Sequence, residues 1–112
     1  MFNDKTTIPV GILSIKAIEN LPANRAINFN GGLCGLGEKI LGVTTKSWKV
    51  GEIASICFSG IAVVETNSAI STIGSEIIAD SQGKVKFSTV ATQGIYSLDK
   101  SAGAGKFVRV KL

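Results

Sequence analysis

Apolar and polar side chains alternate along most of the chain. In residues 53–58, and again in residues 107–112, the side chains fall into two sets that alternate at every position. A period of two places such sets on opposite faces of a β-strand. Apolar runs rich in β-branched residues end at Gly, Asn, Asp or Ser within about ten residues, a spacing typical of all-β domains. We therefore predict an all-β fold, either a small single-domain β-barrel or a jelly-roll-like sandwich.

The same pattern predicts nine strands. They cover residues 8–17, 25–29, 39–45, 52–58, 61–65, 75–80, 84–88, 94–97 and 106–112. Asn30-Gly31 and the stretch Asp80–Gly83 are expected to form tight turns, because Asn, Asp and Gly accept the backbone angles that such turns need.

The strand pattern occurs twice. A Lys-Ser pair and a later glycine stand at positions 46, 47 and 51 and again at 100, 101 and 105, an offset of 54 positions. The segments before the two turns, residues 25–28 and 75–78, are also similar. We interpret this pseudo-duplicated pattern as two related β units, neither of which can bury its apolar face alone.

Two features lie outside this pattern. Residues 1–7 precede the first strand and are polar apart from Met1 and Phe2, so we predict an N-terminal arm followed by a single β domain over residues 8–112. Trp48 stands in a polar loop, where it either caps the core or anchors an interface. The candidate residues for contact with a partner are Phe2, Asn3, Asp4, Lys5 and Trp48.

Composition removes most chemistry from the 112-residue chain. It has no His, which excludes His-based triads, imidazole zinc sites and a histidine pH switch. The two cysteines, Cys34 and Cys57, are too few for a four-thiolate site, and we interpret them as small buried apolar residues. Apolar residues make up 45% and charged residues 18%, which excludes disorder for most of the chain. Without a secretory signal or a long apolar segment, we expect synthesis in a cytoplasm and no membrane association.

The glycine-rich segments do not fit nucleotide-binding motifs. In residues 100–107, a phosphate-binding loop would need Gly in place of Lys100 and Ser or Thr in place of Phe107. In residues 31–37, a dinucleotide fingerprint would need a glycine in place of Ile40. The eight carboxylates show no spacing that selects a catalytic pair or a calcium loop. We predict no enzymatic activity, no cofactor and no metal.

The net charge of +4 leaves a second function open. Twelve basic residues are scattered rather than clustered, which is typical of solvated strands. An alternative is a nucleic-acid-binding small β-barrel module that uses Trp48, Phe87 and Tyr96 for base stacking. A carbohydrate-binding β domain is a third hypothesis, although one Trp and one Tyr offer few platforms for sugar stacking.

The order of several short motifs resembles a known family. The motifs are Leu21–Ile27, Ile40–Thr44, Val50–Ala54, Phe58–Val64, Ile73–Glu76 and Phe107–Leu112. In this order, over residues 8–112, they resemble the small capsid decoration, or cement, proteins of tailed bacteriophages. The resemblance implies a β-rich structural protein without catalytic residues, located on the capsid exterior of the virion. It also implies an oligomer that staples neighbouring subunits of the major capsid protein.

From these points we expect a decoration protein made in the host cytoplasm. Its expected partners are the major capsid protein and itself, with a homodimer favoured over a trimer. A basic surface would help it to approach an acidic capsid exterior.

Overall fold

The computed structural model describes residues 7–88 and 94–112. Its strands are β1 (Ile8–Lys16), β2 (Ala26–Ile27), β3 (Gly42–Thr44), β4 (Ile53–Glu65), β5 (Ile77–Ala79), β6 (Val85–Phe87), β7 (Tyr96–Ser97) and β8 (Phe107–Lys111). The described part contains no helix, which confirms the predicted all-β class. It therefore also contains no helix that could cross a membrane.

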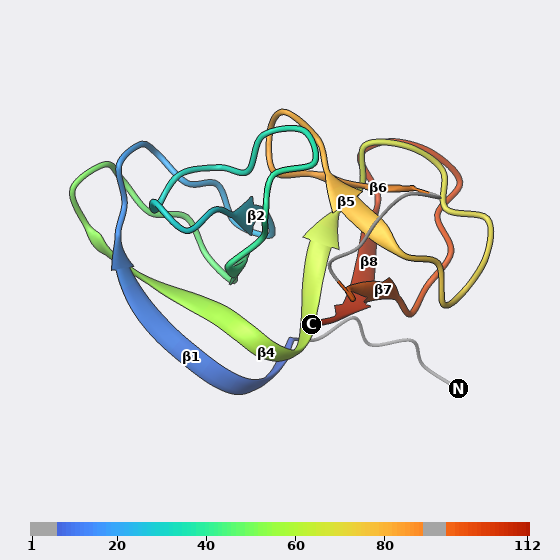
Figure 1. Cartoon of the computed structure of the whole chain (residues 1–112), viewed down its shortest axis with the longest axis horizontal. Coiled ribbons are helices and arrows are strands. Elements are labelled where there is room, and N and C mark those ends of the chain that lie inside the picture. The colour runs from blue at the N-terminus through green and yellow to red at the C-terminus, as the bar shows by residue number, and fades with distance from the viewer. Residues whose placement is uncertain (1–6, 89–93) are drawn as a thin grey trace.

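Six of the strands form one curled sheet that resembles half of a barrel. The order is β2-β3-β4-β8-β7, with β1 paired to β4, and every pairing is antiparallel. Strands β5 and β6 form a separate hairpin. Figure 1 shows a long ribbon of β1 and β4 along the lower left, with β2 above it and β5 to β8 in the right half of the molecule.

Strand β4 divides the molecule into two lobes. We call residues 7–58 the first lobe and residues 59–112, as far as they are described, the second lobe. The N-terminal half of β4 pairs with β1 and β3, and its C-terminal half pairs with β8. The end of the first lobe and the start of the second are therefore one strand.

The prediction of two separate strands at 52–58 and 61–65 is wrong. The Ser59-Gly60 pair looks like a turn in the sequence, but β4 runs through it. Gly60 has a φ of 105°, and a β-carbon there would lie 2.4 Å from the carbonyl oxygen of Ile8. Only glycine allows β1 and β4 to approach so closely, so Gly60 bends the strand without ending it.

Several other predicted strands are too long. The strand expected at 39–45 is limited to Gly42–Thr44, and the one at 25–29 is limited to Ala26–Ile27. The strand expected at 94–97 begins two residues later, at Tyr96. Individual backbone bonds, such as those from Asn28 to Gly32 and from Ile77 to Ile95, hold the intervening residues without extending the strands.

The backbone hydrogen bonds confirm the internal duplication. Leu21 and Trp48 exchange two backbone bonds of 2.8 Å in the first lobe, and Ile70 and Ser101 exchange bonds of 3.1 and 2.9 Å in the second. Trp48 in the first lobe is thus equivalent to Ser101 in the second.

A second equivalence lies nearby. Gly51 donates to Ala17 and Gly105 donates to Thr66, each over 2.8 Å. The 54-residue offset therefore holds for the glycines. It does not hold for the Lys-Ser pairs, which are displaced by one residue because the second loop has an additional residue.

The predicted turns are also equivalent. Asn28 Oδ1 accepts bonds from the backbone N–H groups two and four residues later, at 2.9 and 3.0 Å. Asp80 Oδ1 accepts from the same two positions, at 2.8 and 2.9 Å. The glycines of the two turns, Gly31 and Gly83, both have positive φ angles, of 95° and 73°. Each lobe therefore uses a side-chain oxygen and a glycine to close its turn.

The apolar core crosses the boundary between the lobes. One cluster lies within the first lobe and includes Leu21, Ile27 and Ile56. A larger cluster joins Val43 and Cys57 to second-lobe residues such as Val108, so the two lobes fold as a single domain.

Candidate functional site

The exposed end of the first lobe carries an open pocket of about 500 Å³. It is lined by Asn20, Leu21, Pro22, Ser47, Trp48, Lys49 and Glu52. Two chain segments meet there because of the backbone ladder between Leu21 and Trp48. The structure therefore brings the predicted contact residue Trp48 into a concave surface.

Trp48 has two distinct surroundings. One part of its side chain packs against the first-lobe core, beside Leu21 and Ala54, so it caps the core. The Lys46 ammonium lies 4.6 Å from the centroid of its ring, within the range of a cation–π contact. The indole Nε1 is shielded from solvent and has no hydrogen-bond partner. An unpaired indole N–H is uncommon in a stable core, because such a group normally finds an acceptor.

Polar contacts fix the loop that carries Trp48. Glu52 Oε1 accepts a 2.6 Å bond from the backbone N–H of Lys49, and Asn20 Oδ1 accepts a 2.9 Å bond from that of Val50. The side chains of Lys46 and Lys49 remain exposed beside the pocket. Val50 and Ile53, at the same end of the lobe, are 61% and 60% exposed. The end of the first lobe thus combines apolar area with two exposed lysines, one of which stacks on the Trp48 ring.

The other four predicted contact residues are not placed. Phe2, Asn3, Asp4 and Lys5 lie outside the described residues. Thr7, where the described chain begins, accepts a 3.3 Å bond at its hydroxyl oxygen from the backbone N–H of Val63. Thr7 therefore lies beside the C-terminal half of β4.

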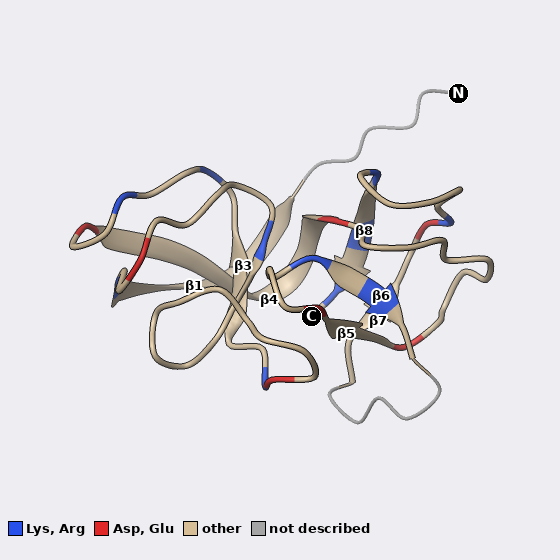
Figure 2. Ribbon diagram, turned by 90° about the horizontal axis from the view of Figure 1, so that it is seen from above, with Lys and Arg blue, Asp and Glu red and all other residues tan. Residues whose placement is uncertain are grey.

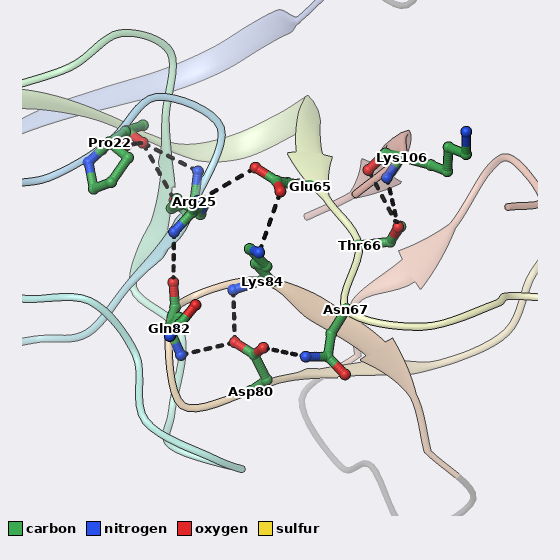
Figure 3. Close-up of polar contacts among 10 residues, drawn as sticks. Pro22, Arg25, Glu65, Thr66, Asn67, Asp80, Gln82, Lys84 and Lys106 are labelled. Carbon is green, nitrogen blue, oxygen red and sulfur yellow. Dashed lines mark hydrogen bonds and ion pairs between the residues drawn. The ribbon is translucent and has the colours of Figure 1, made fainter. Parts of the chain in front are cut away.

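A cluster of charged residues joins the lobes. Arg25 in the first lobe and Lys84 in the second both lie 3.3 Å from carboxylate oxygens of Glu65, at the end of β4. Arg25 also donates a 3.1 Å bond to the carbonyl oxygen of Gln82. Figure 3 shows these side chains converging from three segments. Sequence reasoning missed this cluster, because no local pattern marks residues so far apart in the chain.

The thiols are unsuited to chemistry. Cys34 and Cys57 are both free and buried, as predicted. Burial, with a smaller effect of the nearby Glu38 carboxylate, raises the pKa of the Cys34 thiol to about 12. Burial also raises the pKa of Cys57. A reactive cysteine needs a lowered pKa and access to solvent, and both thiols have the opposite properties.

The described residues give no support to a metal site, a phosphate-binding loop or a base-stacking platform. Within residues 7–88 and 94–112, no three Cys, Asp or Glu side chains are grouped so that they could hold a metal ion. The segment 100–107 leads directly into β8 rather than into the helix that a phosphate-binding loop requires. Figure 2 shows Lys and Arg distributed over both lobes. Trp48 lies in the first lobe and Phe87 and Tyr96 in the second, so the three aromatic residues do not form one stacking platform.

A family model for phage cement proteins matches residues 11–112. The chain belongs to the phage cement protein family. This match confirms the predicted family and its structural, capsid-stabilising role in the virion. A family of structural proteins also argues against enzymatic activity.

A solved structure shares the fold. The N base of the head fiber protein gp8.5 of bacteriophage phi29 superimposes with a TM-score of 0.75 at 15% sequence identity, over 91% of this chain and 92% of that chain. No curated protein matches the chain. At this identity the similarity establishes the common fold.

Proposed function

We propose that this cement protein binds the outer surface of the phage head and holds neighbouring subunits of the major capsid protein together. The family match over residues 11–112 carries the proposal. The body supports it, because a core shared by two lobes and a charged cluster between them give the rigidity that a staple needs. The net charge of +4 favours association with an acidic exterior.

We further propose that the protein acts as a homodimer made in the host cytoplasm. Phe2, Asn3, Asp4 and Lys5 in the arm, together with Trp48, are the proposed contacts with the capsid or with the second copy. A dimer that touches several capsid subunits gains avidity from contacts that are weak individually.

Binding to heads tests the capsid proposal. Expanded heads that lack the protein are incubated with the purified chain, sedimented, and then heated or treated with a chelator. We expect the chain to sediment with the heads and to increase their resistance to disruption. Heads that neither retain the chain nor gain resistance would contradict the proposal.

Sedimentation equilibrium tests the dimer. The expected mass is that of two chains of 11.6 kDa each. A monomer or a trimer at all concentrations would contradict a dimer without affecting the capsid proposal. A variant without residues 2–6, compared in both assays, assigns the arm to the capsid contact or to the dimer contact.

A further inference from the structure

The internal duplication separates residues that the fold needs from residues that it does not. Equivalent positions in the two lobes make the same backbone bonds, so a side chain present in only one lobe is not required for those bonds. The Leu21–Trp48 ladder of the first lobe is matched by the Ile70–Ser101 ladder of the second. Leu21 and Ile70 are both fully buried, so the apolar residue is common to both lobes.

The partners of these two residues differ. The first lobe has the largest side chain of the chain, Trp48, where the second lobe has Ser101. A serine thus forms the ladder in the second lobe, where its hydroxyl also accepts a 3.1 Å bond from the backbone N–H of Ile70 and donates one to the carbonyl oxygen of Ser68. The tryptophan adds an open pocket, a stacked lysine and an unpaired indole N–H, and none of these features is needed to hold the strands together.

The surroundings of Trp48 indicate the chemistry of an occupant. Leu21, Pro22 and the indole supply apolar area in the pocket, and Lys46 and Lys49 supply two exposed cations. The Glu52 carboxylate also lines the pocket, but its Oε1 accepts a bond from the backbone N–H of Lys49, and two exposed lysines stand beside it. An occupant that complements this surface carries an apolar side chain next to a carboxylate.

We infer that the Trp48 end of the first lobe is the surface that docks on the capsid, and that it takes an extended, acidic segment of the major capsid protein. This inference rests on the proposed function. An apolar side chain of the segment fills the pocket against the indole, and its carboxylate lies between Lys46 and Lys49. Tryptophan is enriched among the few residues that supply most of the binding energy of protein interfaces.

Head binding by matched variants tests the inference. Trp48→Ser installs the residue that the second lobe uses at the equivalent position, and Lys49→Glu reverses an exposed charge without touching the core. The controls lie in the second lobe: Ile73→Ser removes an apolar side chain that is 59% exposed, and Lys100→Glu reverses an exposed lysine. Thermal unfolding of every variant accompanies the binding assay.

The expected result is a loss of affinity of about ten-fold or more for Trp48→Ser and Lys49→Glu. The two controls bind heads as the unchanged protein does, and binding of the unchanged protein weakens as salt is added. If Trp48→Ser does not fold, Lys49→Glu against Lys100→Glu decides alone.

Two results would overturn the inference while leaving the proposed function intact. One is unchanged binding by folded Trp48→Ser or by Lys49→Glu. The other is an equal loss in the second-lobe controls. If the unchanged protein itself does not bind heads, the proposed function fails.

Discussion

The duplicated turn predicts which substitutions Asp80 tolerates. Its carboxylate is 7% exposed and accepts three bonds: 2.6 Å from the Asn67 amide, 2.8 Å from the backbone N–H of Gln82 and 2.9 Å from that of Lys84. Asp80→Ala removes both acceptor oxygens, and with them all three bonds, and leaves two backbone donors unpaired beside the core. Each lost bond costs on the order of 1 kcal/mol, so we expect a loss of about 3 kcal/mol in the free energy of unfolding.

Asp80→Asn is the matched control, because the first lobe uses Asn28 at the equivalent position. An amide oxygen accepts the same two backbone bonds there. Only the bond with Asn67 needs rearrangement, and a flip of the Asn67 amide supplies the acceptor. We expect Asp80→Asn to lose about 1 kcal/mol or less.

Urea denaturation of both variants measures the difference. At unchanged m value, the shift in midpoint gives the change in free energy directly. The loss in Asp80→Ala corresponds to a fall in melting temperature on the order of 10 °C for a domain of this size. Equal losses in the two variants, or an Asp80→Ala variant as stable as the unchanged protein, would refute the assignment of the turn to the Asp80 oxygen.

Three further predictions concern other parts of the fold. Glu65→Gln leaves Arg25 and Lys84 without a counter-ion, so we expect the free energy of unfolding in urea titrations to fall by about 2 kcal/mol. Glu76 lies outside the ion pairs found among the described residues, so Glu76→Gln should change this free energy little. Burial raises the pKa of the Cys34 thiol to about 12, so the folded chain retains a proton that the unfolded chain releases above its ordinary pKa of 9.0. The free energy of unfolding therefore falls as the pH rises from 9 towards 12. Cys34→Ala, measured on either side of the ordinary thiol pKa, should remove that part of the pH dependence. Gly60→Ala places a β-carbon 2.4 Å from a backbone oxygen at a φ of 105°, so it should lower the melting temperature strongly in calorimetry. A β-carbon at Gly103 meets nothing within 4 Å, so Gly103→Ala should leave the melting temperature nearly unchanged.

Local patterns predicted much of the fold. The strict alternation in residues 53–58 and 107–112 marked strands that do exist, because one face of each is buried. The places of the two turns, at Asn30-Gly31 and Asp80–Gly83, were also predictable, although the side chain that closes the first is Asn28 and not Asn30.

Contacts between distant segments had no such signal. The duplication was visible in the sequence, but its exact register required the backbone bonds that pair Trp48 with Leu21 and Ser101 with Ile70. The Arg25–Glu65 pair spans 40 residues, and no local pattern links the two residues. The same holds for the pocket: Trp48 was recognisable as an unusual residue, whereas Pro22 and Asn20 gave no sign that they would line a pocket with it.

The continuity of β4 bears directly on how such a protein could reinforce a shell. If the two duplicated units were joined by a flexible linker, a force applied at one end would reorient one unit against the other. Here β4 both ends the first lobe and begins the second, and it pairs with β1 in the first lobe and with β8 in the second. The Glu65 ion pairs and the apolar cluster that contains Val43 and Val108 oppose bending at the same boundary. A force on the Trp48 end is therefore transmitted to the second lobe through hydrogen-bonded backbone.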